Sequence, residues 1–292
     1  MFSDLLAGTS QAPVVVPSRA PSILAFDSGL GGLTVFSELV KARPDADFVY
    51  AADDAAFPYG RLTEADLVDR VLAVMERLVA RYAPDLVVVA CNTASTLVLP
   101  HLRSRFQLPF VGTVPAIKPA AAASRSGRIS ILATPGTVAR DYTRGLIEAY
   151  AAECRVELVG SRRLAGFAEA ELRGTPVSDE DLAAELAPCF VEDEEGRTDV
   201  VVLACTHYPL LLDRLRKVAP WSVAWIDPAP AIARRVTDVL RPAGGRQDLR
   251  PEGDRLGVFT SGAGLDLPLR AALAARGLGQ VFVEAFPLAP EH

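Results

Sequence analysis

The sequence has little positive charge, few histidines and no long apolar run, and each shortage removes a class of function. Its 292 residues include 30 Lys and Arg against 36 Asp and Glu, which gives a formal net charge of −6. Nucleic acid is therefore not an expected partner, because contacts to phosphates need a basic face. No apolar run reaches the roughly 18 residues of a membrane-spanning helix, so we expect no membrane partner either.

The amino terminus lacks the basic start and long apolar stretch of a secretory signal. Residues 1–21 carry prolines and small residues instead, which predicts a flexible tail on a cytoplasmic protein. Disulfides are rare in that reducing compartment. The four cysteines, which form no C-x-x-C pair, are Cys91, Cys154, Cys189 and Cys205. Their spacing supports neither thioredoxin-like chemistry nor structural zinc, and we predict no metal site.

Short Val/Ile/Leu runs alternate with longer amphipathic stretches, a pattern typical of parallel sheets covered by helices. A helix is expected over 64–82, capped by Thr63 and followed by Pro84. The acidic stretch 192–195 predicts a solvated loop. The predicted strands are 22–26, 47–51, 86–90, 128–133, 156–160, 200–204, 223–226 and 257–260.

An internal repeat indicates a duplicated α/β unit. The segment Asp85-Leu86-Val87-Val88-Val89-Ala90-Cys91 aligns with Asp199-Val200-Val201-Val202-Leu203-Ala204-Cys205. Ile23-Leu24-Ala25 recurs as Ile131-Leu132-Ala133 at a similar offset. Buried parallel strands are all rich in valine, which explains the valines alone. The shared Asp and Ala-Cys favour duplication.

Cys91 and Cys205 each end a buried strand, where ligands bind in open parallel sheets. A polar stretch and then a helix follow each, and Pro209 suits the first helical position. A helix N-terminus lowers a thiol pKa from about 8.5 and also binds carboxylates. Free cysteines more often simply pack in cores, and we interpret Cys154 and Cys189 in that way.

Two equivalent bases on one ligand are what inversion of a stereocentre needs, since one removes a proton and the other returns one to the opposite face. Among the three histidines, His292 is the last residue, which leaves His101 and His207 as candidates. His207 lies two residues from Cys205 and could assist that thiol.

A glycine-rich segment, Phe26-Asp27-Ser28-Gly29-Leu30-Gly31-Gly32-Leu33-Thr34, follows the first strand. Its glycines allow the backbone to approach a ligand, Asp27 could orient a thiol, and Ser28 could hold a carboxylate. A dinucleotide-binding loop is the competing interpretation. The G-x-G-G spacing does not match G-x-G-x-x-G, and no acidic residue follows about 20 positions later on a convincing second strand.

With the segment 26–35, Cys91-Asn92-Thr93-Ala94-Ser95 and Cys205-Thr206-His207-Tyr208-Pro209, the sequence resembles the glutamate racemases of the aspartate/glutamate racemase superfamily. Weaker matches are Pro58-Tyr59-Gly60 and Thr134-Pro135-Gly136-Thr137. The motifs keep the family's order over about residues 22 to 265.

The resemblance implies an α/β fold of two pseudo-symmetric three-layer domains with mostly parallel sheets and an active site in the cleft between them. It places 22–113 and 227–292 in the first domain and 114–226 in the second. It also implies racemisation of L- and D-glutamate without any cofactor, to supply peptidoglycan synthesis.

By the same resemblance, Cys91 would deprotonate D-glutamate with support from Asp27. Cys205 would deprotonate L-glutamate with support from His207, and Glu169 is a possible acid helper. The residues implied to hold the substrate are Ser28, Pro58, Tyr59, Gly60, Asn92, Thr93, Thr134, Thr137 and Thr206.

The segment Asp53-Asp54-Ala55-Ala56-Phe57 departs from the family pattern, with an additional acid and no arginine. The run 164–169 departs as well. Aspartate or another small acid stays open as the substrate, as does a non-catalytic ligand-binding protein. A homodimer is the default for such an enzyme.

Overall fold

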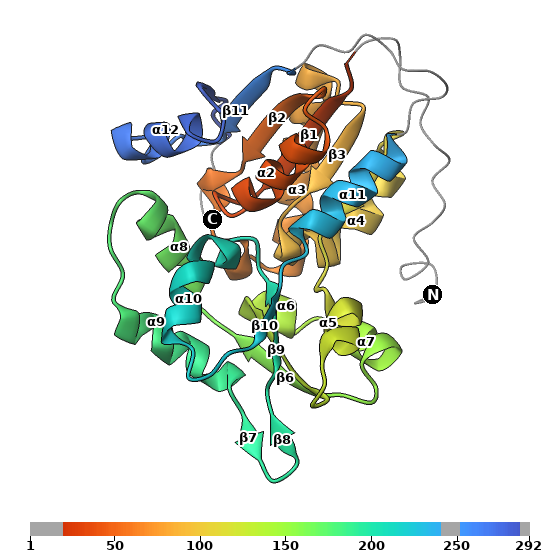
Figure 1. Ribbon diagram of the computed structural model, residues 1–292. Coiled ribbons are helices and arrows are strands. Elements are labelled where there is room, and N and C mark those ends of the chain that lie inside the picture. Colours follow the sequence, from red (N-terminus) through yellow and green to blue (C-terminus); the bar gives the residue numbers. More distant parts are fainter. Residues whose placement is uncertain (1–19, 241–251, 287–292) are drawn as a thin grey trace.

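Two parallel β-sheets organise the chain in the computed structural model, which describes residues 20–240 and 252–286 (Figure 1). The six-stranded sheet has the order β12-β11-β2-β1-β3-β4, and the four-stranded sheet has the order β10-β9-β5-β6. All strand pairs within these two sheets are parallel. The strands of the larger sheet are β1 Ser22–Asp27, β2 Asp47–Ala52, β3 Leu86–Val89, β4 Phe110–Gly112, β11 Arg255–Phe259 and β12 Gln280–Val283. Those of the smaller are β5 Arg128–Ala133, β6 Arg155–Gly160, β9 Val200–Ala204 and β10 Ala224–Ile226.

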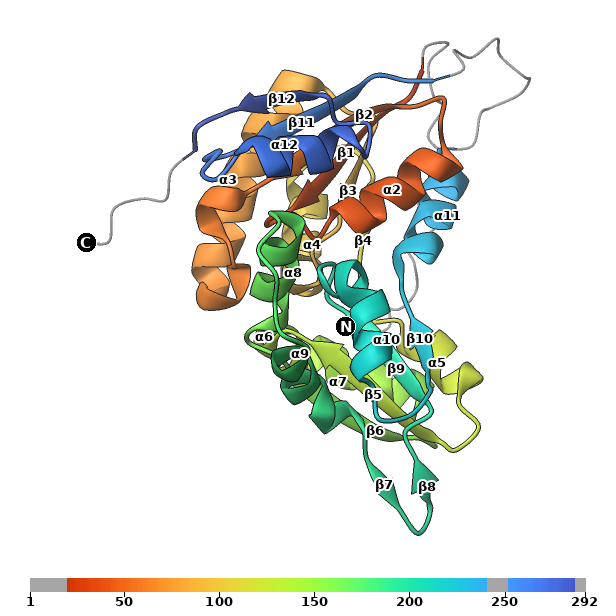
Figure 2. The same ribbon diagram turned by 60° about the vertical axis from the view of Figure 1, so that its left-hand side comes forward.

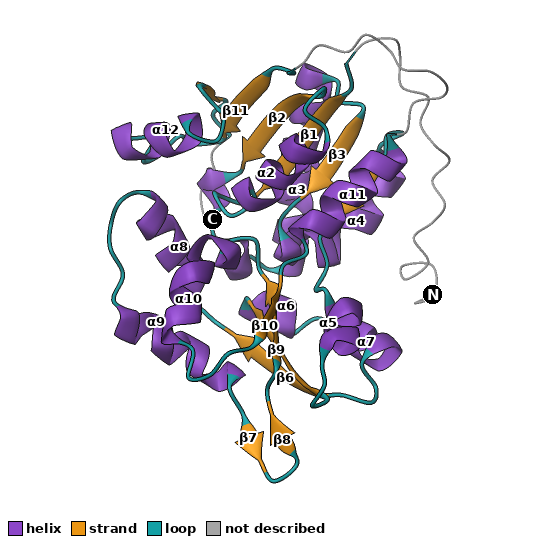
Figure 3. Ribbon diagram, in the orientation of Figure 1, coloured by secondary structure: helices purple, strands orange, loops and turns teal. Residues whose placement is uncertain are grey.

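Helices cover both faces of each sheet, so each half has three layers (Figure 3). One face of the larger sheet packs against α2 Leu33–Ala42, α11 Ala229–Val239 and α12 Leu267–Ala274. Its other face packs against α3 Glu64–Tyr82 and α4 Asn92–Arg105. The smaller sheet lies between α8 Leu164–Leu172, α9 Asp179–Leu186 and α10 Leu212–Val218 on one face, and α5 Ile117–Ala123 and α7 Asp141–Tyr150 on the other. The predicted α/β three-layer fold is confirmed.

The remaining described elements are short. They are η1 Asp54–Ala56, η2 Tyr59–Arg61, α6 Pro135–Val138, η3 Ala187–Cys189, η4 Tyr208–Leu211, β7 Glu192–Asp193 and β8 Gly196–Arg197. The last two form an antiparallel hairpin. The prediction of a loop over 192–195 is therefore wrong in part: the segment is exposed as expected, but Glu192 and Asp193 pair with Arg197 and Gly196. Charged, two-residue strands carry no apolar alternation that could predict them.

The duplication extends to the topology of the sheets. The order β2-β1-β3-β4 in the first sheet is matched by β6-β5-β9-β10 in the second. Ile23 is opposite Leu86 in the first sheet, as Ile129 is opposite Val200 in the second. Since Leu86 and Val200 are equivalent in the repeat, Ile23 corresponds to Ile129. The predicted match of Ile23 with Ile131 is thus wrong by two residues, because similar valine-rich strands align in more than one register.

The two halves meet at the carboxyl ends of their strands, with the larger sheet above the smaller in both views (Figures 1 and 2). All described strands of the larger sheet fall within 22–113 and 227–292, and those of the smaller fall within 114–226.

The domain boundaries themselves stay a prediction. The tail predicted over 1–21 lies outside the described residues except for its last two. Within 20–240 and 252–286, no helix is both long and apolar enough to cross a membrane.

Candidate active site

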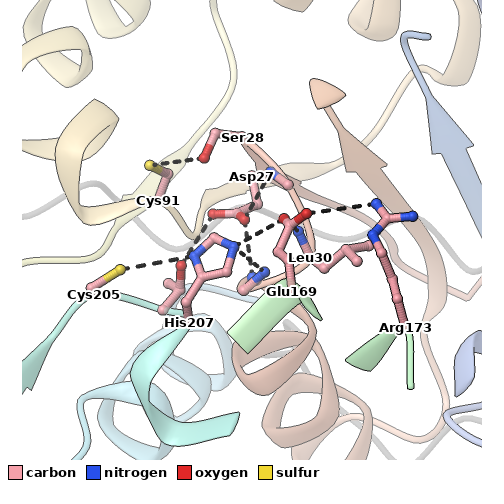
Figure 4. A network of polar contacts seen from close by, with 12 residues as sticks. Asp27, Ser28, Leu30, Cys91, Glu169, Arg173, Cys205 and His207 are labelled. Carbon is pink, nitrogen blue, oxygen red and sulfur yellow. Dashed lines mark hydrogen bonds and ion pairs between the residues drawn. The ribbon is translucent and has the colours of Figure 1, made fainter. Parts of the chain in front are cut away.

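Both repeated cysteines lie where the two halves meet. Cys91 is the N-cap of α4 directly after β3, and its residue is 6% exposed. Cys205 follows β9 and is 5% exposed. After the polar residues that follow Cys205, the helical region begins as the 3-10 helix η4, with Pro209 in its first turn, and continues as α10. The two thiols lie at the same edge of one polar network (Figure 4).

Cys91 is held as a neutral thiol. Burial, and then the negative charge of Asp27, raise its pKa to about 12. The N–H of Ala94 and the hydroxyl of Ser28, whose Oγ lies 3.7 Å from Sγ, oppose that rise. The expectation of a lowered pKa is therefore wrong for Cys91 here, because loss of water outweighs the helix N-terminus.

Cys205 has a different partner, the imidazole of His207. Its Sγ lies 3.8 Å from Nδ1 of His207, whose Nε2 lies 3.1 Å from Oε1 of Glu169. Burial alone would lower the His207 pKa, but the hydrogen bonds to Cys205 and Glu169 raise it to about 10. His207 is thus an imidazolium at neutral pH, and its positive charge lies beside the Cys205 sulfur. The two cysteines occupy electrostatically unlike surroundings.

Glu169 reaches the site from α8 and spans the junction between the halves. Oε1 accepts the N–H of Leu30 at 3.0 Å, and Oε2 lies 3.6 Å from Arg173. Burial opposes ionisation of Glu169, but its hydrogen bond to His207 lowers the pKa below the usual value. The resemblance offered Glu169 only as a possible helper. In this geometry a carboxylate holds the His207 imidazolium.

The glycine-rich segment needs its glycines because side chains of the other half pack against it. A Cβ on Gly31 would lie 2.4 Å from Nδ1 of His207, and one on Gly29 would lie 2.4 Å from Oε1 of Glu169. The Gly31 N–H also lies 3.2 Å from Nε2 of His207. That nitrogen accepts from Gly31 when the ring is neutral and donates to Glu169 when it is protonated.

Asp27 ends β1 and is fully buried. Its Oδ2 accepts the N–H groups of Gly29 and Gly32, each at 3.1 Å, and its Oδ1 accepts the Thr206 hydroxyl at 3.4 Å. Burial raises the Asp27 pKa, which the nearby His207 and both N–H groups partly oppose. Asp27 therefore orders the loop that carries Ser28, and its negative charge also raises the pKa of the Cys91 thiol.

Three hydroxyls from both halves form a cluster beside this network. Thr93 Oγ1 lies 2.9 Å from that of Thr134 and 3.5 Å from that of Thr137, and the last two are 3.1 Å apart. The amide nitrogen and oxygen of Asn92 are both buried, with no hydrogen-bond partner among the described residues. A buried amide without a partner is costly, and the substrate-binding role predicted for Asn92 stays a prediction.

The segment Pro58-Tyr59-Gly60 follows a cis peptide bond between Phe57 and Pro58. Tyr59 is 2% exposed, and its hydroxyl donates to Asp53 at 2.7 Å, so it faces the interior. A Cβ on Gly60 would meet nothing within 4 Å. Contact of this segment with a substrate therefore runs through its backbone or through Pro58, and the predicted roles of all three residues stay predictions.

Sequence reasoning missed the groups that surround this segment. Phe57 packs against His207, with ring centroids 5.4 Å apart, although its position suggested no role. Asp53 forms a buried ion pair with Arg70 on α3. In the sequence, Arg70 stood out only as one residue of the helix predicted over 64–82. No local spacing signals either contact, because each joins segments that only the fold brings together.

The remaining candidates lie outside the network. His101 is exposed on α4. Cys189 is fully buried in one hydrophobic cluster of the second half, and Cys154 packs against the other, as expected for packing residues. Among the residues that the structure describes, no group of three His, Cys, Asp or Glu side chains could hold a metal ion.

Comparisons with known proteins match this arrangement. The family model of Asp/Glu/hydantoin racemases matches residues 28–236. Glutamate racemase of Mesorhizobium japonicum is 57% identical over 242 residues, which are 82% of this chain and 91% of the relative. That of Brucella anthropi is 52% identical over 257 residues, covering 86% and 92%.

A solved structure is similar over nearly its whole length. Glutamate racemase of Escherichia coli, in complex with L-glutamate and the activator UDP-MurNAc-Ala, has a TM-score of 0.83 and 41% identity, and the match covers 91% of this chain and 99% of that one. The motifs, the paired halves and these likenesses agree. The chain belongs to the glutamate racemases, within the Asp/Glu/hydantoin racemase family.

Proposed function

We propose that this chain interconverts L- and D-glutamate by proton transfer between two cysteines, without a cofactor. The observation that carries the proposal is the pair of thiols, Cys91 and Cys205, which end equivalent strands of two duplicated halves and meet at one buried site. A hydrolase or transferase needs one nucleophile. A racemase needs a base on each face of the reacting carbon.

Cys91 is a neutral thiol and Cys205 lies beside a cation, so the free enzyme is ready to take a proton at Cys205 and to give one from Cys91, as conversion of L-glutamate requires. The Cys205 thiolate, beside the His207 imidazolium, takes the α-proton: the C–H bond breaks and an S–H bond forms. The Cys91 thiol then gives its proton to the opposite face, and its S–H bond breaks as the new C–H bond forms. The reverse transfer converts D-glutamate, and Glu169 keeps His207 charged and in place.

Uncharged polar groups would hold the substrate. We propose that Asn92, Ser28, Pro58, Tyr59, Gly60, Thr206 and the hydroxyl cluster of Thr93, Thr134 and Thr137 bind its carboxylates and ammonium group. The unpartnered amide of Asn92 supports this set most directly. The site residues are nearly all buried, so the halves must separate for entry and close again, which excludes water around the carbanion.

The test is incubation with L-glutamate in D2O and no added cofactor. We expect D-glutamate carrying deuterium at Cα, detected by chiral chromatography with mass spectrometry, and a final mixture of equal L and D. The double variant Cys91→Ala, Cys205→Ala is the control for other sources of exchange. Exchange of L-aspartate alone would reassign the substrate, and no exchange with either acid would overturn the proposal.

The cellular context follows from the same proposal. We propose that the protein acts in the cytoplasm, where D-glutamate would enter peptidoglycan synthesis. We also propose a homodimer, as is common for such enzymes. Light scattering of the purified chain tests the oligomeric state.

We also propose an activator site, since the Escherichia coli relative binds UDP-MurNAc-Ala as an activator. A cavity of about 410 Å³ lies between elements of both halves, α4 and α11 on one side and α5 and α7 on the other. Its lining includes Arg103, Lys118 and Arg235. Burial lowers the pKa of Arg103, and the nearby charge of Arg235 lowers it further. Three cations in a partly apolar cavity favour a bound anion such as a diphosphate.

Removing one of these cations should weaken activation. We expect UDP-MurNAc-Ala to increase the racemase activity of the wild type. In Arg235→Met, its half-maximal concentration should rise about tenfold, the effect of losing one charge-assisted contact. Activity at increasing activator concentration measures the effect. An unchanged half-maximal concentration would place the activator elsewhere.

A further inference from the structure

A buried ion pair behind the substrate site is not explained by the two-base chemistry. The guanidinium of Arg70 donates to both oxygens of Asp53, with Nε 2.9 Å from Oδ2 and Nη2 2.5 Å from Oδ1. The side chains are 7% and 0% exposed. A buried ion pair rarely stabilises a fold more than apolar residues of the same volume would, so this pair needs an explanation other than stability.

Asp53 connects three parts of the first half at the carboxyl end of β2. Its Oδ2 also accepts the Tyr59 hydroxyl at 2.7 Å, and its Oδ1 accepts the Thr260 hydroxyl at 2.7 Å. Its own N–H donates to the carbonyl of Asp27 at 2.9 Å. Both carboxylate oxygens are thus saturated by donors from α3, from the Pro58–Gly60 segment and from the end of β11.

The tyrosine on this carboxylate belongs to the buried cluster that also contains the Cys91 thiol. The 3-10 helix η2, which Tyr59 begins, contacts α4. Burial and the charge of Asp53 raise the Tyr59 pKa well above its usual value, so the hydroxyl remains a donor to the carboxylate. The position of Asp53 therefore determines where Pro58 and Gly60 lie relative to Cys91.

Arg70 is itself held from behind by the last described segment. Its Nη2 also donates to the carbonyl of Phe286 at 2.5 Å, and the guanidinium carbon lies 4.5 Å from the centroid of the Phe286 ring. The planar fork of arginine serves the carboxylate and this carbonyl together, which a lysine ammonium cannot do in the same geometry.

We propose that Arg70 is a positioning residue for substrate binding: through Asp53 and Tyr59 it fixes the Pro58–Gly60 segment against Cys91. This inference rests on the proposed glutamate site. Arg70 touches no reacting atom in it. Its loss therefore displaces a binding segment and weakens the hold on substrate and transition state alike.

The test compares Arg70→Met with Arg77→Met in the full chain. Arg77 is two turns along the same helix, donates to the carbonyl of Ala285 at 3.2 Å and lies 5.6 Å from the Phe286 ring, but its described contacts do not reach Asp53. We expect KM for both glutamate enantiomers to rise at least tenfold in Arg70→Met with kcat within about threefold. Arg77→Met should keep KM within twofold.

A second variant and a binding measurement keep the result decisive. Arg70→Lys should show an intermediate KM, and glutamate should raise the melting temperature of both Arg70 variants less than that of the wild type. A role in fold stability alone would lower the melting temperature and the active fraction but leave KM unchanged, and a folded Arg70→Met with wild-type KM overturns the inference. So would failure of both variants to fold. A wild type that does not racemise glutamate instead overturns the proposed function.

Discussion

Replacing either Cys91 or Cys205 by alanine is expected to abolish racemisation of glutamate. One sulfur takes the proton from one face of the α-carbon and the other delivers a proton to the opposite face, and a positioned proton donor or acceptor contributes about 10²–10⁴-fold to a rate. Chiral chromatography of L- and D-glutamate measures the loss. Because the enantiomers have equal free energy in water, kcat/KM must fall by the same factor in both directions.

Isotope exchange separates the two roles. With Cys91→Ala, Cys205 can still remove the α-proton of L-glutamate and return a deuteron from D2O to the same face, so L-glutamate should acquire deuterium without inversion. Cys205→Ala should show the same for D-glutamate only. Both variants should fold, and a thermal melt checks this. Full racemisation in either folded variant would end the two-base assignment.

Replacing His207 by glutamine should cost about 10²-fold or more in kcat/KM. Glutamine can still hydrogen bond to Glu169, but it cannot carry the positive charge that lies 3.8 Å from the Cys205 sulfur. Initial rates in both directions measure the change. Arg77→Met, which leaves the network intact, serves as the control for nonspecific effects. A His207→Gln enzyme with wild-type kcat/KM would show that the charge is dispensable.

The pH dependence of stability gives an independent check on the same charge. The His207 pKa is raised in the folded protein, from 6.5 to about 10. The folded state therefore binds the proton more tightly, and this contribution is fully present below about pH 6.5 and lost as pH rises through about 10. The excess unfolding free energy of the wild type over His207→Gln should shrink across that window in urea melts. An excess that is constant with pH would contradict the shift.

Strand composition and short motifs predicted much of this molecule. The helix over 64–82 has the predicted bounds, and Thr63 accepts the Asp66 N–H as expected for its cap. The strands β5 and β9 have the predicted residues, since a buried parallel strand is a continuous apolar run with polar ends. Four strands, β4, β7, β8 and β12, were not predicted, because runs of two to four residues seldom carry a readable period.

The sequence by itself determined the chemistry available to this protein. Two repeated Ala-Cys strand ends specify two thiols at equivalent places, and the glycine-rich segment specifies a backbone that other groups approach closely. These features are local, so a short stretch of chain contains all the information they need.

Only the tertiary structure decided how the two thiols differ. Cys91 lies near Asp27 and is held neutral, whereas Cys205 lies near an imidazolium held by Glu169 from a separate helix. It also decided that Arg70 meets Asp53, and that Asp53 accepts the Tyr59 hydroxyl. Charge and loss of water depend on distance in space, and residues brought together across the junction of two halves have no fixed spacing along the chain.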